Sequence, residues 1–508
     1  MSRNRRIVFG VVGLVAAGLL VFAIWHDPAH TGSTADPALV LRGHVTDESG
    51  SAAGIRIRFQ GHAESTLSDA DGGFALPMPK SVLNVTAWKP GHFVGFAPSD
   101  SRPLTIELRK LPPFDDENYQ WVDPRPGANS FSCGNCHEAI FDEWRGSAHG
   151  RPGETSRFRD LFLGLDVQGK ENGWSLVREH PDGSEVCASC HNPAPSGQPN
   201  FLGTEERHWG NVHCDFCHKI SGPASGDIGL AHGRHGLELL RPREGQLILG
   251  PLEDAARREN AFSPFQRDSR LCASCHEGVV FGVSVYSTYS EWLASPAGQS
   301  GIQCQACHMK PTGKMTNIAP DHGGVERNPA AIANHRFFDT DQRTMLARSL
   351  KLNLTCSAAS QGVRASVTVT AEGVGHRVPT GLPDRNLVLV VEAFDAMGKP
   401  LKAVDGPSLP SSVGDEFHGI SGKLFAKMLR DSEGRSPVPF WQATQEFTDT
   451  RLRPGIPERS TFSFPAEAAK ISAKLVYRRF WPGVAKSKGW QDDTWIIVEM
   501  IEPITKQD

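Results

Sequence analysis

The stretch GNVHCDFCHKI, Gly210 to Ile220, contains the pattern Cys-x-x-Cys-His that decides how this chain folds. The pattern occurs five times, as CGNCH, CASCH, CDFCH, CASCH and CQACH. Its cysteines are Cys133, Cys136, Cys187, Cys190, Cys214, Cys217, Cys272, Cys275, Cys304 and Cys307, and its histidines are His137, His191, His218, His276 and His308. Ten of the eleven cysteines in the 508-residue chain therefore belong to one motif, which leaves only Cys356.

Cys-x-x-Cys-His is the attachment sequence of c-type haem. Two thiols one helical turn apart each form a thioether with a haem vinyl group, and the adjacent histidine binds the iron from the proximal side. A zinc half-site or a redox dithiol also uses Cys-x-x-Cys. Neither of them requires a histidine directly after the second cysteine, which all five copies have. We therefore predict five covalently bound haem c groups, each with its iron on a motif histidine.

A sixth iron ligand must come from a histidine outside the motifs if the haems are bis-histidine. The candidates are His149, His213, His235, His335 and His376, with His232 and His322 ranked below them. His213 directly precedes Cys214, and the proximal face of that haem belongs to His218. Reaching the opposite face of its own porphyrin would strain the chain, so His213 is expected to bind the iron of a neighbouring haem. The alternative for each candidate is an ordinary surface histidine.

Two related segments follow the first and fourth motifs. EWRGSAHG contains Glu143, Trp144, Ser147 and His149, and EWLASPAG contains the matching Glu291, Trp292 and Ser295, with Ala297 in place of His149. The first segment resembles the distal-histidine segment of multihaem cytochromes related to hydroxylamine oxidoreductase and to the tetrahaem cytochromes of ammonia oxidisers. That resemblance covers about residues 112 to 500 and implies a multihaem cytochrome.

The fourth haem is the expected exception if one iron is open. Related cytochromes often carry a histidine in the approach to this motif, where the chain has Asn260. The following segment has likewise Ala297 in place of a histidine. Both nearby places for a second ligand are therefore empty, although a remote histidine such as His335 can still fill the site.

The haem-bearing region is expected to span residues 112–350 and to be mostly α-helical or irregular. From Cys133 to His308 there are 176 residues for five motifs. The stretch is rich in Gly, Pro and Ser and has few long apolar periodic segments, so side chains alone do not supply its core. We expect the porphyrins to be the core and to lie in near contact with one another.

The N-terminus predicts export. Residues 1–30 contain a basic start followed by an uncharged run over residues 7–25, which is close to the length of about 20 residues that spans a bilayer. We predict an uncleaved signal anchor, with a cleaved signal peptide as the alternative. The positive-inside rule then places the rest of the chain in the periplasm or otherwise outside the cytoplasm. The formal charge of −4 argues against nucleic acid as a partner.

Two β regions are expected to flank the haem region, which gives a multidomain α+β fold. In residues 37–111, IRIRF and LTIEL alternate as half-buried strands do, and the run resembles a carboxypeptidase regulatory-like β-sandwich. A second β-sandwich is expected over residues 351–508. Its segment GVGHRVPTG looks like one that closes several multihaem cytochromes, which implies that His376 reaches back to a haem.

Bis-histidine ligation closes both faces of an iron and leaves electron exchange as its chemistry. We therefore expect an electron-transfer protein that passes electrons between other redox proteins. One alternative is an oxidoreductase with one open haem that acts on a small nitrogen or sulfur compound. The other is a structural subunit of a cytochrome filament or surface complex. Whether the chain is an enzyme stays open at this point.

Overall fold

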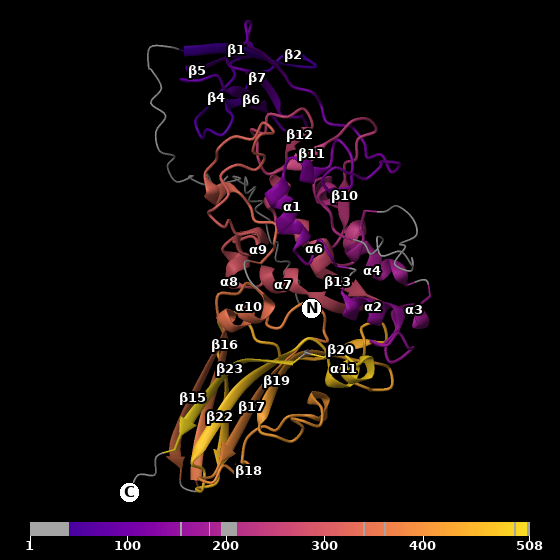
Figure 1. The fold of residues 1–508 in the computed structure, drawn as a ribbon, viewed down its shortest axis with the longest axis vertical. Coiled ribbons are helices and arrows are strands. Elements are labelled where there is room, and N and C mark those ends of the chain that lie inside the picture. The colour runs from indigo at the N-terminus through magenta and orange to yellow at the C-terminus, as the bar shows by residue number, and fades with distance from the viewer. Residues whose placement is uncertain are drawn as a thin grey trace, which may run out of the picture.

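The computed structural model describes residues 40–152, 155–181, 183–194, 211–338, 341–359, 362–491 and 494–504. The expected anchor, residues 1–30 with the apolar run 7–25, lies outside the described residues. Among the helices that are described, none is both long enough and apolar enough to cross a membrane. The described chain is multidomain α+β, with two regions of sheets at opposite ends and a region of short helices and loops between them (Figure 1).

The first region consists of two small sheets around one core. Its strands are β1 (Val40–Asp47), β2 (Gly50–Ser51), β3 (Arg56–Phe59), β4 (Ser65–Leu67), β5 (Gly73–Pro77), β6 (Asn84–Trp88), β7 (Gly95–Pro98) and β8 (Thr105–Glu107). One sheet has the order β2-β1-β5, with β8 parallel to β1, and the other has the order β4-β3-β6-β7. Val45, Ile57, Val85 and Ile106 come from both sheets and are fully buried between them.

The turn before β5 has the chemistry expected from its sequence. The Asp69 carboxylate accepts hydrogen bonds from the backbone N–H of Asp71 at 3.0 Å and of Gly73 at 2.7 Å. Such bonds hold an Asx-type turn without a metal ion. This part of the chain therefore uses its acidic residues to connect strands.

The middle region is built from short helices and short strands. Its α-helices are α1 (Glu138–Arg145), α2 (Ser156–Leu163), α3 (Leu176–Glu179), α4 (Ser184–His191), α5 (Cys214–Cys217), α6 (Arg270–His276), α7 (Thr288–Leu293), α8 (Pro296–Gln299), α9 (Cys304–His308) and α10 (Gln342–Ser349). Its 3₁₀ helices are η1 (Cys133–Asn135), η2 (Gly233–Gly236), η3 (Pro264–Arg267) and η4 (Pro329–Ala331). Its strands pair two by two: β9 (Ile220–Pro223) with β10 (Leu237–Leu239), β11 (Ile248–Gly250) with β12 (Asn260–Phe262), and β13 (Glu277–Val280) with β14 (Val283–Ser287).

Side chains do not form one continuous core in this region. Its buried apolar clusters are small and separate, for example Ala194, Phe216, Ile220 and Leu237 in one place and Phe93, Leu247, Leu249 and Ala261 in another. A region of this length normally buries a single larger cluster. The arrangement agrees with the expectation that a cofactor supplies much of the packing.

The C-terminal region is a pair of larger sheets. Its strands are β15 (Leu350–Ala359), β16 (Gly362–Ala371), β17 (Asn386–Phe394), β18 (Pro400–Leu401), β19 (Gly422–Arg430), β20 (Gln445–Asp449), β21 (Glu458–Phe464), β22 (Lys470–Arg478) and β23 (Thr494–Pro503), with η5 (Ser411–Val413) and α11 (Pro482–Lys488) in the connections. The sheets have the orders β15-β16-β21 and β20-β19-β17-β22-β23, with β18 beside β17. One core lies between them, and Cys356 of β15 packs against it.

The C-terminal region is fastened to the middle region by buried polar contacts. Lys488 of α11 is fully buried and donates to the backbone carbonyls of Asp160 and Asn172. The Trp490 indole N–H donates to the Asp160 carboxylate at 2.7 Å. A buried ammonium without partners is very unfavourable, so these bonds fix how the two regions meet.

The N-terminal sheets dock on the middle region through a buried carboxylate. Asp254 is 0% exposed and pairs with Arg327 at 2.9 Å and with Arg58 of β3 at 3.5 Å. It also accepts the backbone N–H of Gly61 at 2.7 Å. The partners lower the pKa of Asp254 against the effect of burial, so the carboxylate stays charged.

Replacing Asp254 by Ala is expected to loosen the N-terminal sheets. Two arginines would be left without their buried partner, which typically costs about 3–5 kcal/mol. Limited proteolysis should then release residues 40–111 faster than from the unmodified protein. The matched control is Glu253→Ala, because Glu253 pairs with Arg58 at the more exposed rim. Equal protease resistance of the Asp254 variant and the control would contradict the assignment.

Candidate haem-binding site

Each of the five motifs occupies a single helical turn. The first lies in and directly after η1, and the others lie in α4, α5, α6 and α9, of which α4, α6 and α9 end on their motif histidine. Helical geometry places residues three apart on the same face, so the two thiols of each motif project toward the same side. The local structure is therefore the one that thioether attachment of one haem requires.

Most motif histidines are oriented by a hydrogen bond to a backbone carbonyl. The Nδ1 of His137 bonds the carbonyl of Ile318 at 2.7 Å, and the Nδ1 of His218 bonds that of Leu249 at 2.7 Å. His191 bonds Pro152 in the same way at 3.2 Å, and His308 bonds Phe337. A carbonyl fixes the proton on Nδ1, which leaves the lone pair of Nε2 for a metal. Iron-ligating histidines normally make such a hydrogen bond with the ring nitrogen that does not bind the metal.

Burial keeps the candidate ligands neutral. Desolvation lowers the pKa of His149, His308 and His335 to about 4. A histidine binds metal only in its neutral form. Near neutral pH these rings are therefore ready to bind iron without first losing a proton.

Cysteines of different motifs are in contact. Cys214 neighbours Cys133 closely enough for the two thiols to shift each other's pKa. The same holds for Cys275 and Cys190 and for Cys272 and Cys304. Cys217 also affects the pKa of both cysteines of the fourth motif. If each motif carries a haem, the first and third, second and fourth, fourth and fifth, and third and fourth motifs would bring the edges of their haems together.

His376 faces the histidine of the fifth motif. The ring centres of His376 and His308 are 6.2 Å apart and their planes differ by 9°. Two metal–nitrogen bonds of about 2 Å each, plus the offset from each nitrogen to its ring centre, add up to roughly 6 Å. The spacing therefore leaves room for one iron between the rings. His376 lies in the loop between β16 and β17, so the C-terminal sheets supply this ring, as the sequence suggested.

His149 faces the histidine of the fourth motif. Its ring centre is 6.2 Å from that of His276, with the planes at 84°. The sequence left the fourth haem as the one that could be open unless a remote histidine filled the site, and His149, from the segment after the first motif, is the ring that the structure places near His276. The backbone carbonyl of Asn260 accepts the backbone N–H of Val94 from the N-terminal sheets at 2.9 Å.

His335 lies near the histidine of the third motif. Its largest charge interaction is with His218, followed by His137. Its own Nδ1 bonds the carbonyl of Ala333 at 3.2 Å, which leaves Nε2 available. The Nδ1 of His376 likewise bonds the carbonyl of Arg377 at 3.1 Å, which leaves its Nε2 available. Both candidates therefore carry the hydrogen bond that the motif histidines use.

His213 is used differently. Its Nδ1 accepts the backbone N–H of Phe216 at 3.2 Å, so His213 is the N-terminal cap of α5. A neutral ring that accepts at Nδ1 carries its proton on Nε2 and has no free lone pair for iron. In the described chain, the ring packs against Trp121 at 5.5 Å rather than against another histidine. The geometry does not bring this candidate together with a neighbouring motif.

His235 and the two lower-ranked candidates lie near the surface of the haem region. His235 is exposed and pairs with Glu185 of α4 at 3.0 Å. His232 lies close enough to His235 and Glu185 for both of them to affect its pKa. His322 is exposed and lies within electrostatic range of His137. None of these three shows the paired-ring geometry of His149 or His376 within the described residues.

The two related segments hold equivalent places in the structure. Glu143 accepts the backbone N–H of His335 at 2.9 Å, and Glu291 accepts that of Arg377, next to His376, at 3.2 Å. Each glutamate therefore fixes a segment that carries a candidate ligand. Glu291 is itself held by the buried guanidinium of Arg451 at 2.7 Å.

The tryptophans of these segments also make matching bonds. Trp144 donates to the carbonyl of Val212, two residues before the third motif, at 2.8 Å. Trp292 donates to that of Ile302, two residues before the fifth motif, at 2.8 Å. The framework of both copies is thus the same, although only the first carries a histidine.

Ala297 has a physical role in the second copy. A Cβ on Gly375 would lie 3.4 Å from the Cβ of Ala297 and 3.3 Å from the Trp292 ring. The loop that brings in His376 therefore packs onto the place where the first copy has His149. A histidine at position 297 would collide with this loop. The second copy therefore has the loop of His376 at the place where the first copy has His149.

Phe337 is a site residue that the sequence did not indicate. Its backbone has φ of 64°, which is unusual for a bulky residue, and its carbonyl bonds the ring of His308. Its own ring lies 4.1 Å from that of His149. The carbonyl partners of the motif histidines were equally hidden, since a backbone carbonyl leaves no mark in a sequence.

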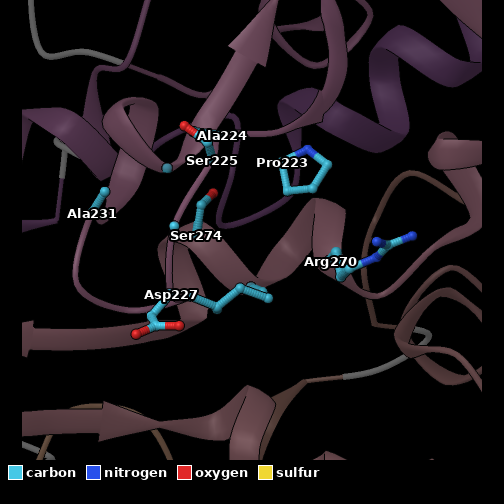
Figure 2. Close-up of a pocket in the computed structure, with 11 residues that line it drawn as sticks. Pro223, Ala224, Ser225, Asp227, Ala231, Arg270 and Ser274 are labelled. Atoms are coloured by element: carbon cyan, nitrogen blue, oxygen red, sulfur yellow. The ribbon is translucent and has the colours of Figure 1, made fainter.

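A small hollow lies beside α6. It is lined by Arg270 and Ser274 of α6, by Pro223 at the end of β9 and by Ser225 and Asp227 of the loop after β9 (Figure 2). None of the residues that line it is a cysteine or a histidine. It is therefore not a place where one of the motifs would hold haem.

Two comparisons with known proteins agree with the site. Residues 132–219, which contain the first three motifs, match the family model of cytochrome c554 and c-prime. A penta-heme cytochrome c552 from Thermochromatium tepidum has a similar structure, with a TM-score of 0.54 and 26% identity, covering 73% of this chain and 97% of that one. No curated protein matches the chain.

These findings support a multihaem c-type cytochrome with covalently bound haem c. The motifs, the oriented histidines and the paired rings suit that cofactor. The wider relation to hydroxylamine oxidoreductase and the resemblance of the N-terminal sheets to a carboxypeptidase regulatory-like domain stay predictions.

His213→Ala is expected to destabilise the protein without opening a haem. The helix α5 would lose its cap, which costs about 1 kcal/mol. The ferric spectrum should stay low-spin to the same extent, and the midpoint of denaturant unfolding should fall. His213→Asn is the matched control, because asparagine also caps helices. A new high-spin signal in the Ala variant would restore His213 as an iron ligand.

Glu291→Ala is expected to release the loop that carries His376. The backbone N–H of Arg377 would lose its acceptor and Arg451 its buried partner. Ferric haem should then gain a high-spin fraction in magnetic resonance, since one ring no longer stays in place. Glu143→Ala is the counterpart and should affect a different haem, through His335. A fully low-spin spectrum of the Glu291 variant would show that the loop holds its position without this carboxylate.

Proposed function

We propose that this protein is an extracytoplasmic pentahaem c-type cytochrome that relays electrons between other redox proteins. The observation that carries the proposal is the pairing of motif histidines with distant ones, His276 with His149 and His308 with His376, each at 6.2 Å. An iron held between two imidazoles has no free position for a substrate. Outer-sphere electron exchange is the chemistry that remains.

The number of five haems rests on the five complete motifs and on the similarity to a penta-heme cytochrome. We assign His149 to haem 4, His376 to haem 5 and His335 to haem 3, the last on its proximity to His218. Each haem would supply a one-electron iron centre. The chain's own residues hold that centre by two thioethers and orient its ligands.

The thiol contacts support an order for the relay. Haem 1 meets haem 3, haem 3 meets haem 4, and haem 4 meets both haem 2 and haem 5. Cys307 is exposed, whereas the other nine motif cysteines are only partly exposed. The fifth haem is therefore the proposed point at which an external redox partner gives or takes electrons.

The location outside the cytoplasm is supported by the chemistry of the cofactor, because c-type cytochromes are typically extracytoplasmic. The proposed membrane anchor rests on the sequence of residues 7–25 alone. The enzymatic alternative requires an iron with one open face, and the structural alternative requires contacts between several copies of the chain.

Intact-mass measurement and magnetic resonance together test the proposal. The exported protein is expected to weigh the polypeptide plus five haems, and its ferric spectrum is expected to contain only low-spin centres. Four or fewer haems after full maturation would contradict the pentahaem assignment. A high-spin centre that binds cyanide, nitrite or hydroxylamine would replace the relay by the enzymatic alternative.

A further inference from the structure

The segment around the fifth motif is positively charged, although the chain as a whole has a formal charge of −4. Residues 292–320 begin in α7, pass through α8 and α9 and contain Lys310 and Lys314 but no Asp, Glu or Arg. Both lysines are exposed. A lysine on a long flexible stem keeps its ammonium group in water, so these two charges face solvent. The face that carries the fifth motif therefore attracts anions.

Two acidic residues border this face, and each has its own cationic partner. Asp268 lies beside α9, because its backbone carbonyl accepts the side chain of Gln305 at 2.9 Å, and its carboxylate pairs with Arg270 at 2.6 Å. Glu291 directly precedes the acid-free segment, but its side chain is only 5% exposed and pairs with Arg451 at 2.7 Å. These two carboxylates therefore do not cancel the charge of the lysines.

Exposed apolar side chains lie on the same face. Leu293 at the end of α7 is 54% exposed, and Ile302, just before α9, is 46% exposed. The indole N–H of Trp292 donates to the carbonyl of Ile302 at 2.8 Å, which holds these two segments together. Phe338 is 39% exposed, and its ring centre lies 5.0 Å from that of His308. Apolar side chains with charged groups around them are typical of a surface that docks another protein.

Cys307 brings the edge of haem 5 to this surface. It is the exposed cysteine of the fifth motif, whereas the other nine motif cysteines are only partly exposed. A thioether would fix one vinyl edge of the porphyrin at the Cys307 sulfur. Lys310 follows three residues later in the sequence. A protein that docks against the lysines would therefore place its own redox centre close to the haem edge.

We propose that this face is the docking surface for an acidic redox protein that exchanges single electrons with haem 5. The proposal rests on the proposed function, because it uses haem 5 as the point of contact. Opposite charges steer the two proteins together, and the apolar side chains then make the direct contact. Electron-transfer complexes are small and transient, so a few such residues suffice. The face consists of Leu293, Ile302, Cys307, Lys310, Lys314 and Phe338.

The first test measures the charge of the face with two small oxidants of opposite charge. The full-length, haem-loaded and reduced protein is mixed in stopped flow with tris(oxalato)cobaltate(III), a trianion, or with hexaammineruthenium(III), a trication. Each takes one electron from a ferrous haem and becomes cobalt(II) or ruthenium(II). At low salt, Lys310→Glu/Lys314→Glu is expected to slow the reaction with the anion about tenfold and not to slow the reaction with the cation. The difference should shrink as salt is added, because the screening length falls from about 30 Å at 0.01 M to about 10 Å at 0.1 M.

Lys399→Glu/Lys402→Glu is the matched control for the change of charge. These two lysines are exposed and flank β18, which lies at the far end of the C-terminal sheets from α9 (Figure 1). The control is expected to leave both rates as they are in the unmodified protein. Equal effects of the two double variants would overturn the proposal, because the anion would then respond only to the total charge.

The second test uses flavodoxin, an acidic flavoprotein, as the protein probe. Its hydroquinone gives one electron to the ferric protein and becomes the semiquinone. The Lys310/Lys314 variant should slow this step about tenfold at low salt, and binding of oxidised flavodoxin to the ferric protein, followed by the amide resonances of flavodoxin, should weaken. Leu293→Gln/Ile302→Gln should weaken binding of flavodoxin severalfold without changing the rate with the cobalt complex, because a small ion needs no apolar contact.

The outcomes separate the docking surface from the relay itself. Flavodoxin binding and rates that are unchanged in the lysine variant would place the docking surface elsewhere and overturn the proposal, while the relay stands. If the unmodified protein gives electrons to neither small oxidant and takes none from flavodoxin, the proposed function fails and the docking surface fails with it.

Discussion

The constraint on which the proposed haem sites depend is the spacing of two imidazole rings across one iron. Covalent attachment fixes one ring beside its haem, but the second must arrive at roughly 6 Å from the first with its free nitrogen inward. His149 and His376 meet this condition at 6.2 Å from His276 and His308. The loops that carry His149 and His376 come from distant parts of the chain, so other contacts must hold them in these positions. The glutamates, tryptophans and carbonyl acceptors of this region provide that support.

The sequence predicted the features that depend on local pattern. The motifs are five consecutive residues each, and the alternating stretches that became β3 and β8 are set by which face is buried. The second ligands were less predictable, because they depend on how distant segments meet. His376 was placed by a resemblance in its loop. The sequence named His335 as a remote candidate for the fourth motif, whereas the structure brings His149 closest to His276.

His213 is a second residue whose role the sequence does not determine. Its position before Cys214 is equally suited to ligation and to capping, and the sequence contains nothing that separates the two roles. In the structure the backbone N–H of Phe216 bonds the Nδ1 of His213, which favours capping. In the paired segments around Trp144 and Trp292, the shared Glu and Trp residues make matching bonds. The loop of His376 packs beside Ala297, where the first segment has His149.

The C-terminal sheets are therefore part of the haem site. They supply His376, and Arg451 at the end of β20 holds the glutamate that fixes the loop of His376. Lys488 and Trp490 fasten the same region to the helices around the second motif. Because these contacts are buried, the sheets and the haem region must reach their final arrangement together. If His376 binds the iron of haem 5 as proposed, that ligation depends on the folding of a region that contains no haem motif, so the last ligand would be in place only when the whole chain is folded.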